Sequence, residues 1–318
     1  MPYTPPFQRS ARTDMLSMHI AELVGMLRPH SALSTNPSLH RDLRVRTIHS
    51  SLAIEGNTLS EDAVTAILDG KRVLGPESDI REVKNARNAY SLLPELNPHS
   101  VNDLLRAHLT MMDGLAAGAG RFRANNVGVY REGRLIHTGT PARYLHTVIT
   151  DLFSWLQNTT EHSLLTSCIF HYEFEFIHPF SDGNGRMGRM WQMLILARWR
   201  DMLQWLPVES LIAQRRDEYY ERFITSNNEG SSTPFVEFML EIIAEALQPF
   251  ANPPDPAAER ARHTLAFFRS DPTATVRELA AHLGCSVATA ERTVKQLREE
   301  GALVRRGSAR KGRWEVLS

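Results

Sequence analysis

Apolar residues recur every three or four positions along most of the chain, which is the spacing of amphipathic helices. The first such stretch places Leu16, Ile20, Leu23 and Leu27 on one face. The same period predicts further helices at residues 39–55, 58–68, 80–92, 100–112, 142–157, 163–177, 186–200, 211–225 and 233–247. The chain is therefore predicted to be mainly α-helical up to about residue 247.

One short stretch departs from the helical period. Apolar residues at 127–129 and 135–136 flank a Glu-Gly turn at 132–133. This pattern predicts a single β-hairpin within the helical body. An exposed hairpin edge can pair with an extended segment of another protein by strand addition. The alternative is that the hairpin is only a surface feature, and His137 in its second strand is interpreted as exposed and polar.

The last quarter of the chain has a different pattern. Residues 248–256 contain four prolines and predict a linker, because proline interrupts helices. Beyond the linker, helices are predicted near residues 264–268, 275–283 and 286–300, followed by strands at 303–306 and 313–317. This order resembles a winged helix-turn-helix, with residues 286–300 in the recognition position.

Exposed polar and basic side chains of this tail are candidates for contacts with DNA phosphates. They are Thr289, Arg292, Lys295, Arg305, Arg306, Arg310, Lys311 and Arg313. Glu291, Glu299 and Glu300 dilute the basic surface. A protein-interaction module of the same fold therefore stays open as an alternative.

Charge separates the tail from the body. The whole chain has 36 basic and 36 acidic residues, but residues 257–318 hold 12 basic against 7 acidic side chains. The tail is therefore basic and the body acidic. Two cysteines, Cys168 and Cys285, fall in different predicted domains, which argues against a disulfide and favours the cytoplasm. No signal peptide or membrane span is expected.

The richest chemistry lies at residues 178–189, which read HPFSDGNGRMGR. A glycine-rich loop that enters a helix offers backbone N–H groups and the positive end of the helix dipole to an anion. Arg186 and Arg189 share one face of the first helical turn and can bind phosphate oxygens. Asp182 is an oxygen ligand suited to Mg²⁺, and His178 can act as a general base.

Each of these parts has an ordinary explanation when it stands alone. A Gly-Asn-Gly sequence is commonly a turn, a single histidine commonly belongs to the core or surface, and two arginines can form a solvated face. All of them at fixed spacing, however, favour a phosphate-handling site. Residues 178–189 match in full the signature of Fic-domain proteins, His-x-Phe-x-Asp/Glu-Gly-Asn-Gly-Arg-x-x-Arg, so the chain resembles this family over about residues 40–245.

The resemblance implies a Fic (Fido) helical fold with a short β-hairpin flap. It also implies a protein adenylyltransferase that transfers AMP from ATP to a Tyr, Thr or Ser hydroxyl of a target protein, or to itself. Relatives that transfer phosphate instead carry a lysine before the arginine, so Gly185 favours AMP transfer. A bifunctional enzyme that also removes AMP remains open, as does a homodimer.

The resemblance also implies roles for individual residues. His178 is the implied base and Asp182 the implied Mg²⁺ ligand. The implied nucleotide-binding residues are Gly183, Asn184, Gly185, Arg186, Arg189, Val127, Gly128, Tyr220 and Asn228. Within this reading the hairpin covers the nucleotide and presents the target hydroxyl to His178.

A second informative stretch lies near residue 55. Ser51 and Glu55 are four positions apart and share one helix face, with Glu55 at the helix C-terminus, where the dipole disfavours an anion. Glu55 therefore either points into water or has a cationic partner. The segment resembles the inhibitory motif of Fic proteins, Ser/Thr-x-x-x-Glu-Gly/Asn, in the class whose inhibitory helix is N-terminal. The resemblance implies that Glu55 pairs with Arg189 and blocks the γ-phosphate position.

Other chemistries are less well supported. His171 and His178 are seven residues apart, so a zinc site of the i, i+4 type is rejected. His171, Glu173 and Glu175 are interpreted as one polar helix face. The sequence has no P-loop. A DNA-binding regulator whose Fic domain is a sensor or inactive is the alternative function.

Four regions follow from these patterns. Residues 1–110 form an N-terminal helical region with the inhibitory helix at about 39–56. Residues 111–247 form the Fic catalytic core, residues 248–257 the proline-rich linker, and residues 258–318 the winged helix-turn-helix domain.

Overall fold

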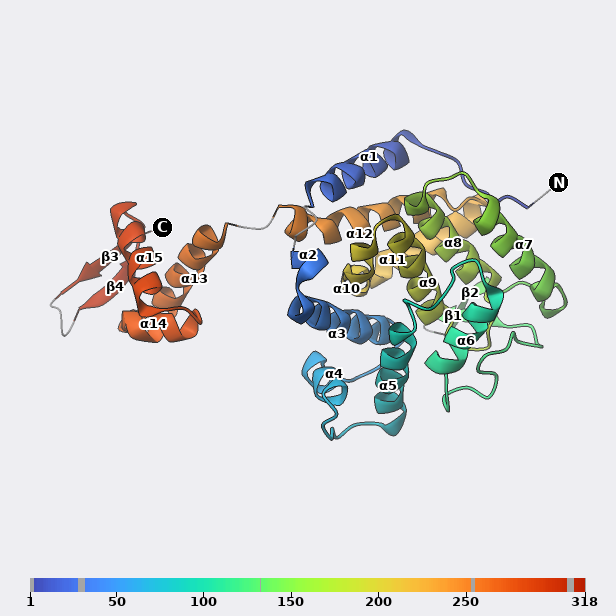
Figure 1. Ribbon diagram of the computed structural model, residues 1–318, viewed down its shortest axis with the longest axis horizontal. Helices are drawn as coiled ribbons and strands as arrows, with labels where there is room; N and C mark the ends of the chain where they lie inside the picture. Colours follow the sequence, from blue (N-terminus) through green and yellow to red (C-terminus); the bar gives the residue numbers. More distant parts are fainter. Residues whose placement is uncertain (1–2, 28–31, 132, 253–254, 308–311, 318) are drawn as a thin grey trace. The chain divides into compact units, whose positions relative to one another are not determined.

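The computed structural model describes residues 3–27, 32–131, 133–252, 255–307 and 312–317, and it divides the chain into two compact units (Figure 1). The first unit ends at Ala251 and the second begins at Asn252. The first is helical apart from one hairpin, and the second is a small helical domain with a two-stranded wing. The predicted fold class is confirmed.

The first unit contains the helices that position the site. They are α1 (Ala11–Met26), α2 (Ala32–Thr35), α3 (Pro37–Ile54), α4 (Glu61–Leu68), α5 (Glu77–Ser91), α6 (Val101–Met111), α7 (Leu145–Asn158), α8 (Ser163–Ile177), α9 (Asn184–Trp199), α10 (Val208–Gln214), α11 (Arg216–Glu229) and α12 (Thr233–Ala251). Short 3-10 helices, η1 (Ala142–Tyr144) and η2 (Asp201–Trp205), precede α7 and α10.

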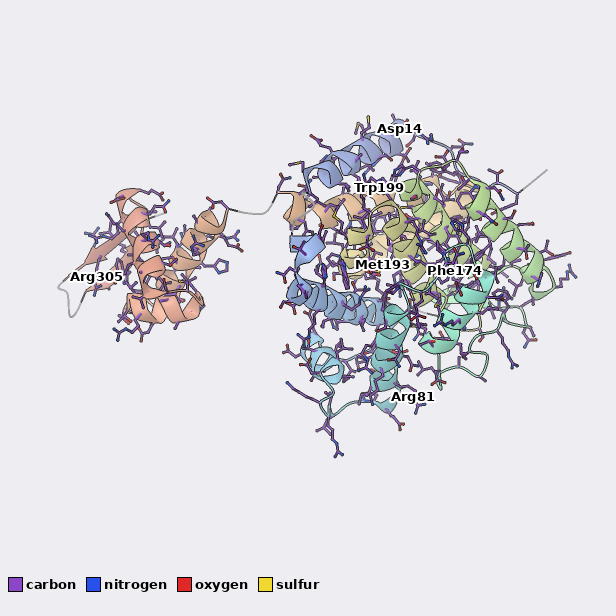
Figure 2. The ribbon with its side chains drawn as sticks, viewed as in Figure 1. Asp14, Arg81, Phe174, Met193, Trp199 and Arg305 are labelled. Atoms are coloured by element: carbon purple, nitrogen blue, oxygen red, sulfur yellow. The ribbon has the colours of Figure 1, made fainter. Side chains whose placement is uncertain are left out.

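Helices α8 and α9 form the centre of this unit. They are buried on nearly every side, because other helices enclose them. Phe174 of α8 and Met193 of α9 are both buried in the interior (Figure 2). One hydrophobic core lies among α3–α9 and another among α1, α3 and α8–α12. Residues on both sides of position 110 share the first core.

The hairpin consists of β1 (Gly128–Arg131) and β2 (Arg134–Thr138), paired antiparallel. A register irregularity between Val129 and Tyr130 bends it. His137 is half-buried rather than exposed, because its ring packs on Phe176 and its Nε2 lies 2.7 Å from the Phe176 carbonyl oxygen. The expectation of an exposed His137 was wrong, and the residue fastens the hairpin to the end of α8.

Several predicted helix boundaries differ from the structure, and the helix predicted near residues 264–268 spans Pro256–Ser270, so it begins inside the predicted linker. The helix expected at 211–225 is interrupted at Arg215, which leaves helical geometry and forms ion pairs with Glu218, Glu241 and Glu245. Helix α12 continues through Pro249 to Ala251. Pro249 has no N–H, so the helix loses one backbone hydrogen bond near its end. The helix continues because Phe250 packs against the second core. Part of the predicted linker, residues 253–254, lies outside the described residues.

The C-terminal unit contains α13 (Pro256–Ser270), α14 (Val276–His282), α15 (Val287–Glu299), β3 (Leu303–Arg306) and β4 (Arg313–Val316). Thr275 and Glu278 form the expected capping box at α14. Trp314 of β4 is buried and donates a hydrogen bond from Nε1 to the Ala274 carbonyl. These features define a winged helix-turn-helix with α15 as its second helix.

Cys168 is buried in the first unit, and Cys285 is half-buried in the second; both are free thiols. Within the described ranges, no helix is both long enough and apolar enough to cross a membrane.

Candidate active site

The loop between α8 and α9 is held by its own side chains. Phe180 is fully buried and stacks on His108, with ring centroids 3.6 Å apart. The Asn184 amide accepts a hydrogen bond from the Phe180 N–H at 2.8 Å and donates one to the Phe180 carbonyl at 2.9 Å. The side chain of Asn184 therefore shapes the loop, and what it offers an anion is its backbone N–H.

His178 ends α8 in a left-handed conformation, with φ 53° and ψ 62°. It has the only positive φ among the described non-glycine residues, a conformation that costs on the order of 1 kcal/mol. Its Nδ1 lies 3.3 Å from the Glu175 carbonyl, which favours a proton on Nδ1 and leaves Nε2 as an acceptor. Burial lowers the pKa of His178 to about 4. The imidazole is therefore neutral near pH 7.

Arg123 fixes the backbone around His178 and was not identified from the sequence. It is buried and donates from Nε to the His178 carbonyl at 2.7 Å and from Nη1 to the Asn125 carbonyl at 2.8 Å. Its Nη2 also donates to the carbonyls of Ile177 and Thr140. One guanidinium thus joins the end of α8 to both ends of the hairpin segment.

His108 of α6 supports the other side of the loop. Its Nδ1 accepts a hydrogen bond from the Gly120 N–H at 2.9 Å, so the Nε2 proton is directed to the Asp182 carbonyl at 3.0 Å. Burial lowers the pKa of His108 to about 4. The ring therefore stays neutral and holds the backbone at the position of the predicted metal ligand.

The N-terminus of α9 provides the anion-binding geometry. Gly183 has φ 82°, a conformation that glycine adopts without strain, and α9 begins at Asn184. The first N–H groups of a helix have no partner within the helix, so those at Asn184 and Gly185 can donate to an anion. Asp182 is 60% exposed, and its Oδ1 accepts hydrogen bonds from the Gly183 N–H and Arg186.

Arg186 is almost fully buried between two carboxylates. It lies 2.7 Å from Glu82 of α5 and 3.1 Å from Asp182. Glu82 also accepts a hydrogen bond from Asn57, which follows the inhibitory motif. Sequence reasoning missed Glu82, because nothing in the local pattern of α5 indicates a partner more than a hundred residues away.

Arg189 contacts the predicted inhibitory segment directly. Its Nη2 lies 2.7 Å from Glu55 Oε1 and 3.0 Å from the Ser51 carbonyl, and its Nε donates to Ser51 Oγ at 3.1 Å. Burial alone would lower the pKa of Arg189. The interactions of the guanidinium with Glu55, Tyr219 and Glu175 are larger in sum and raise this pKa. The predicted pairing of Glu55 with Arg189 is present in the structure.

Gly185 lets these two residues meet. A Cβ atom at position 185 would lie 2.3 Å from Glu55 Oε1 and 3.0 Å from Arg189 Nη1. The carboxylate therefore occupies the space beside the N-terminus of α9 that any side chain at 185 would fill. An anion in the loop and the Glu55 carboxylate compete for neighbouring positions.

A second carboxyl group, Glu175 of α8, lies in the same site. Burial raises its pKa to about 8, assisted by the Glu55 charge and opposed by Arg189. Its Oε2 lies 3.8 Å from His178 Nδ1. The group is therefore largely protonated near pH 7, which limits the negative charge beside His178.

The hairpin covers a small cavity above His178. The cavity measures about 30 Å³ and is lined by Val129, Ile136, Glu175, His178, Tyr219, Tyr220 and Phe223. This volume is room for a water molecule and is far below that of nucleotide-sized pockets. We call this arrangement, with the small cavity at His178 and Glu55 paired with Arg189, the closed site.

The other predicted contacts are spread around this cavity. Val127 and His178 both lie close to Gly139. A Cβ atom added to Gly139 would be 3.4 Å from Val127 Cγ2 and 3.2 Å from His178 Cβ. Gly128 begins β1, and Tyr220 lines the cavity from α11. Asn228 is exposed two turns further along α11. The structure thus brings Tyr220 to the cavity, whereas Asn228 does not line it.

The polar face of α8 is internal. His171 is fully buried between Gln192 and Tyr219, and Glu173 accepts a hydrogen bond from the Tyr3 hydroxyl at 2.6 Å. Across the described residues, no group of three or more His, Cys, Asp or Glu side chains is arranged to hold a metal. Trp191 is fully buried, whereas Trp155, Trp199 and Trp205 are half-buried.

A helical body with an anion-binding loop between two buried helices, followed by a winged helix-turn-helix, defines the class of protein. The Fic/DOC family model matches residues 98–196, and an HTH domain model matches residues 260–308. A Fic family protein from Desulfovibrio desulfuricans G20 is 38% identical and has a TM-score of 0.74, with 99% of this chain and 98% of that chain covered. This chain belongs to the Fic/DOC family.

Curated relatives carry an activity in their names. Protein adenylyltransferase fic-1 of Caenorhabditis elegans is 30% identical over 214 residues, which are 63% of this chain and 40% of the relative. Protein adenylyltransferase Fic of Aedes aegypti is 28% identical over 232 residues, covering 68% and 44%. The chain therefore spans less than half the length of these relatives.

Proposed function

We propose that this protein transfers AMP from ATP to a hydroxyl side chain of a target protein. The observation that carries the proposal is the position of His178, whose Nε2 is an available acceptor beside the anion-binding N-terminus of α9. The names of the curated relatives support the same reaction class.

In the proposed reaction, the target hydroxyl oxygen attacks the α-phosphorus of ATP. A new P–O bond forms, the bond between the α-phosphorus and the bridging oxygen breaks, and pyrophosphate leaves. His178 Nε2 accepts the hydroxyl proton, because the lowered pKa keeps it unprotonated near pH 7. The backbone N–H groups at Asn184 and Gly185 stabilise the phosphate oxygens.

Asp182 fits the role of Mg²⁺ ligand in this proposal. Its carboxylate is 60% exposed, and a single protein carboxylate together with substrate phosphates and water is a common way to hold this ion. Bound Mg²⁺ would neutralise phosphate charge. Arg186 and Arg189 are proposed to bind the β- and γ-phosphates once their present carboxylate partners give way.

Glu55 is proposed to inhibit the reaction. Its carboxylate occupies the guanidinium face of Arg189 that a phosphate would use, and its charge repels a phosphate at the same place. ATP would therefore bind poorly or with its α-phosphate misplaced. The Ser51 contacts with Arg189 hold this arrangement from the same helix face.

Transfer of label from ATP radioactive at the α-phosphate tests the proposal. We expect Glu55→Gly to increase labelling of the protein itself or of lysate proteins by at least tenfold, because Arg189 is freed. His178→Ala in the Glu55→Gly background should abolish the label. Equal low labelling in wild type and Glu55→Gly would contradict the inhibitory role, and unchanged labelling in His178→Ala would contradict the assigned base.

The winged helix favours DNA as a second partner. Thr289, Arg292 and Lys295 lie along α15, although Lys295 is 3.8 Å from Glu299 and the wing residue Arg306 pairs with Glu315. Arg310 and Lys311 lie outside the described residues. A steep loss of DNA affinity with added salt would support phosphate contacts, and a flat salt response would favour a protein partner.

A further inference from the structure

A second cavity, separate from the catalytic loop, lies along the inhibitory helix. Its volume is about 600 Å³, within the range of small-molecule sites. Helix α3 contributes one wall through residues such as Arg44, Val45 and Ile48, while α5 and η2 contribute Arg87 and Trp205. The same helix carries Ser51 and Glu55 in its last turns.

Arg44 is the most informative side chain of this cavity. Its guanidinium is stacked between Tyr90 and Trp205, 4.8 Å from the centroid of each ring. It donates to two neutral acceptors, Met193 Sδ and the Gln204 carbonyl, each at 3.4 Å, which is long for a bond to oxygen. In the part of the chain that the structure describes, no carboxylate lies within 4 Å of it. Burial lowers its pKa, and the charges of Tyr90 and the more distant Glu209 oppose this shift without cancelling it.

The rest of the cavity defines what would complement this cation. Arg87 adds a second positive charge at the exposed rim, whereas the charge of Arg41 is already taken by an ion pair with Asp69. Val45, Ile48 and Leu68 provide an apolar wall. A ligand that satisfies both features carries an anionic group for the arginines and an apolar ring for the wall of Val45, Ile48 and Leu68.

We propose that this cavity binds a small organic anion with an aromatic ring, and that the bound ligand strengthens the inhibitory contact of Glu55 with Arg189. The ligand would bridge α3, α5 and η2 and hold α3 in its present position. A ligand shifts an equilibrium toward the state that it binds better, and here that state keeps Glu55 in the catalytic site. The regulatory half of this inference rests on the proposed function, but the binding half does not.

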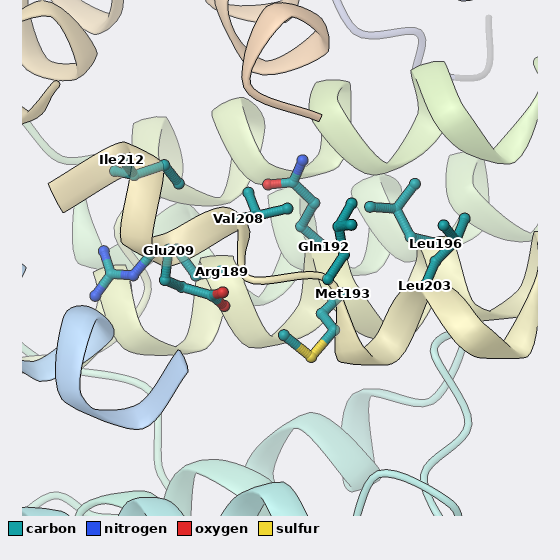
Figure 3. A pocket seen from close by; sticks show the side chains of 9 residues that line it. Arg189, Gln192, Met193, Leu196, Leu203, Val208, Glu209 and Ile212 are labelled. Atoms are coloured by element: carbon teal, nitrogen blue, oxygen red, sulfur yellow. The ribbon is translucent and has the colours of Figure 1, made fainter. Parts of the chain in front are cut away.

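Contacts connect the cavity to Arg189. The Tyr90 hydroxyl lies 3.4 Å from Glu209 of α10, and the charge of Arg189 acts on this hydroxyl. Glu209 and Arg189 both line a small cavity between α9 and α10 (Figure 3). The charges of Arg189 and Arg44 both act on the buried Glu209 carboxyl. Glu209 thus lies between Arg44 and Arg189 in this chain of charges, and Arg189 in turn pairs with Glu55.

Binding is tested on the full chain by calorimetric titration with phenyl phosphate. Inorganic phosphate supplies the charge without the ring, and benzyl alcohol supplies the ring without the charge. We expect both to bind at least tenfold more weakly than phenyl phosphate. Arg44→Gln should weaken phenyl phosphate binding at least tenfold. Arg46→Gln removes the same charge from an exposed position of α3 that does not line the cavity, and should leave binding unchanged.

Arg87→Gln provides a second test in case Arg44→Gln unfolds the protein, because Arg87 is exposed at the rim. It should weaken binding several-fold. Absence of phenyl phosphate binding to wild type, or equal binding by wild type, Arg44→Gln and Arg87→Gln, would overturn the site.

Regulation is measured as AMP incorporation with and without phenyl phosphate. The ligand should reduce labelling of wild type several-fold and leave labelling of Glu55→Gly unchanged. Binding without any effect on an active wild type, or equal inhibition of both proteins, would overturn the regulatory half. If neither protein labels any target, the proposed function fails while the titration still decides whether the cavity binds the anion.

Discussion

At the scale of single residues, the closed site depends on how near Glu55 comes to the N-terminus of α9. The carboxylate oxygen lies where a side chain at position 185 would begin. Glycine at 185 therefore serves two purposes, because it leaves room for Glu55 in the closed state and for phosphate oxygens in the proposed active state. The substitution Gly185→Ala tests the first of these purposes, because its effect on the free energy of unfolding can be compared with and without Glu55.

We expect Gly185→Ala to destabilise the wild type by about 1–2 kcal/mol, because the methyl group displaces Glu55 and leaves the buried Arg189 without its charged partner. In a Glu55→Gly background the same change should be neutral or stabilise by up to about 1 kcal/mol, since alanine favours the helix over glycine. Urea unfolding of the four proteins measures this difference. Equal effects in the two backgrounds would show that Gly185 and Glu55 are not coupled.

Residues of the site were predictable where their chemistry is local. His178, Asp182, Gly185 and Arg189 stand within one short stretch, and Glu55 lies in a recognisable motif of its own. Other residues were missed because their role depends on distant backbone carbonyls or side chains. They are Arg123, His108, Glu82 and Glu175, none of which differs by sequence pattern from an ordinary surface or core residue.

At the scale of elements, the end of α3 places Glu55. The Gly56 N–H donates to the Ala53 carbonyl at 3.1 Å, and the Asn57 N–H donates to the Leu52 carbonyl at 3.1 Å. These two bonds form a Schellman motif, with Gly56 at φ 100°. The helix therefore ends at Glu55. The Glu55 carboxylate contacts Arg189 of α9.

We expect Gly56→Ala to lower stability by about 1–2 kcal/mol, because alanine is strained at this positive φ. No atom lies within 4 Å of the added Cβ, so the cost comes from the backbone alone. Gly25→Ala in α1 is the matched control, since its Cβ also meets no neighbour and its φ is not positive. It should stabilise the protein by about 0.5–1 kcal/mol. Thermal unfolding measures both, and a neutral Gly56→Ala would contradict the role of the motif.

Helix positions were well predicted from periodicity because most helices bury one strongly apolar face. Errors arose where tertiary contacts override local signals. Arg215 breaks a continuous helical pattern because it has acidic partners on α12, and Pro249 stays within α12 because Phe250 still has a core to pack against. The half-buried His137 was unpredictable for the same reason, since its partner Phe176 belongs to another element.

At the scale of the whole molecule, the body buries an unusual set of titratable groups between its two hydrophobic cores. Burial lowers the pKa of His108 and His178 to about 4 and that of His171 to about 3. Burial also raises the pKa of Glu173 and Glu209 to about 7 and that of Glu175 to about 8. The three histidines and the three glutamates are therefore all largely uncharged in the folded protein at mildly acidic pH.

The two sets make opposite contributions to stability as pH changes. As the pH decreases from about 6.5 toward 4, the histidines bind protons in the unfolded state but not in the folded state. The free energy of unfolding therefore decreases over this range. Each raised carboxyl contributes stability that is complete below about pH 4.5 and is lost as pH rises through 7–8. Between about pH 4.5 and 6.5 the two slopes oppose each other. Unfolded histidine is half protonated at pH 6.5, so the histidine contribution ends only near pH 7.5, and above that pH only the carboxyl contribution continues to change.

We therefore expect the free energy of unfolding to decrease by about 2 kcal/mol between pH 6.5 and 8.5, because the loss from the carboxyls exceeds the remaining gain from the unfolded histidines. Urea unfolding at half-unit pH steps measures the curve. Glu175→Gln and Glu209→Gln should each flatten it, because the amide has no proton to lose at these pH values. Glu77→Gln, at a carboxylate whose side chain is 89% exposed, is the control and should leave the curve unchanged. A wild-type curve that is level from pH 6.5 to 8.5 would mean that these carboxyls are already ionised in the folded protein, and the closed site would then hold Glu175 as a second anion beside Glu55.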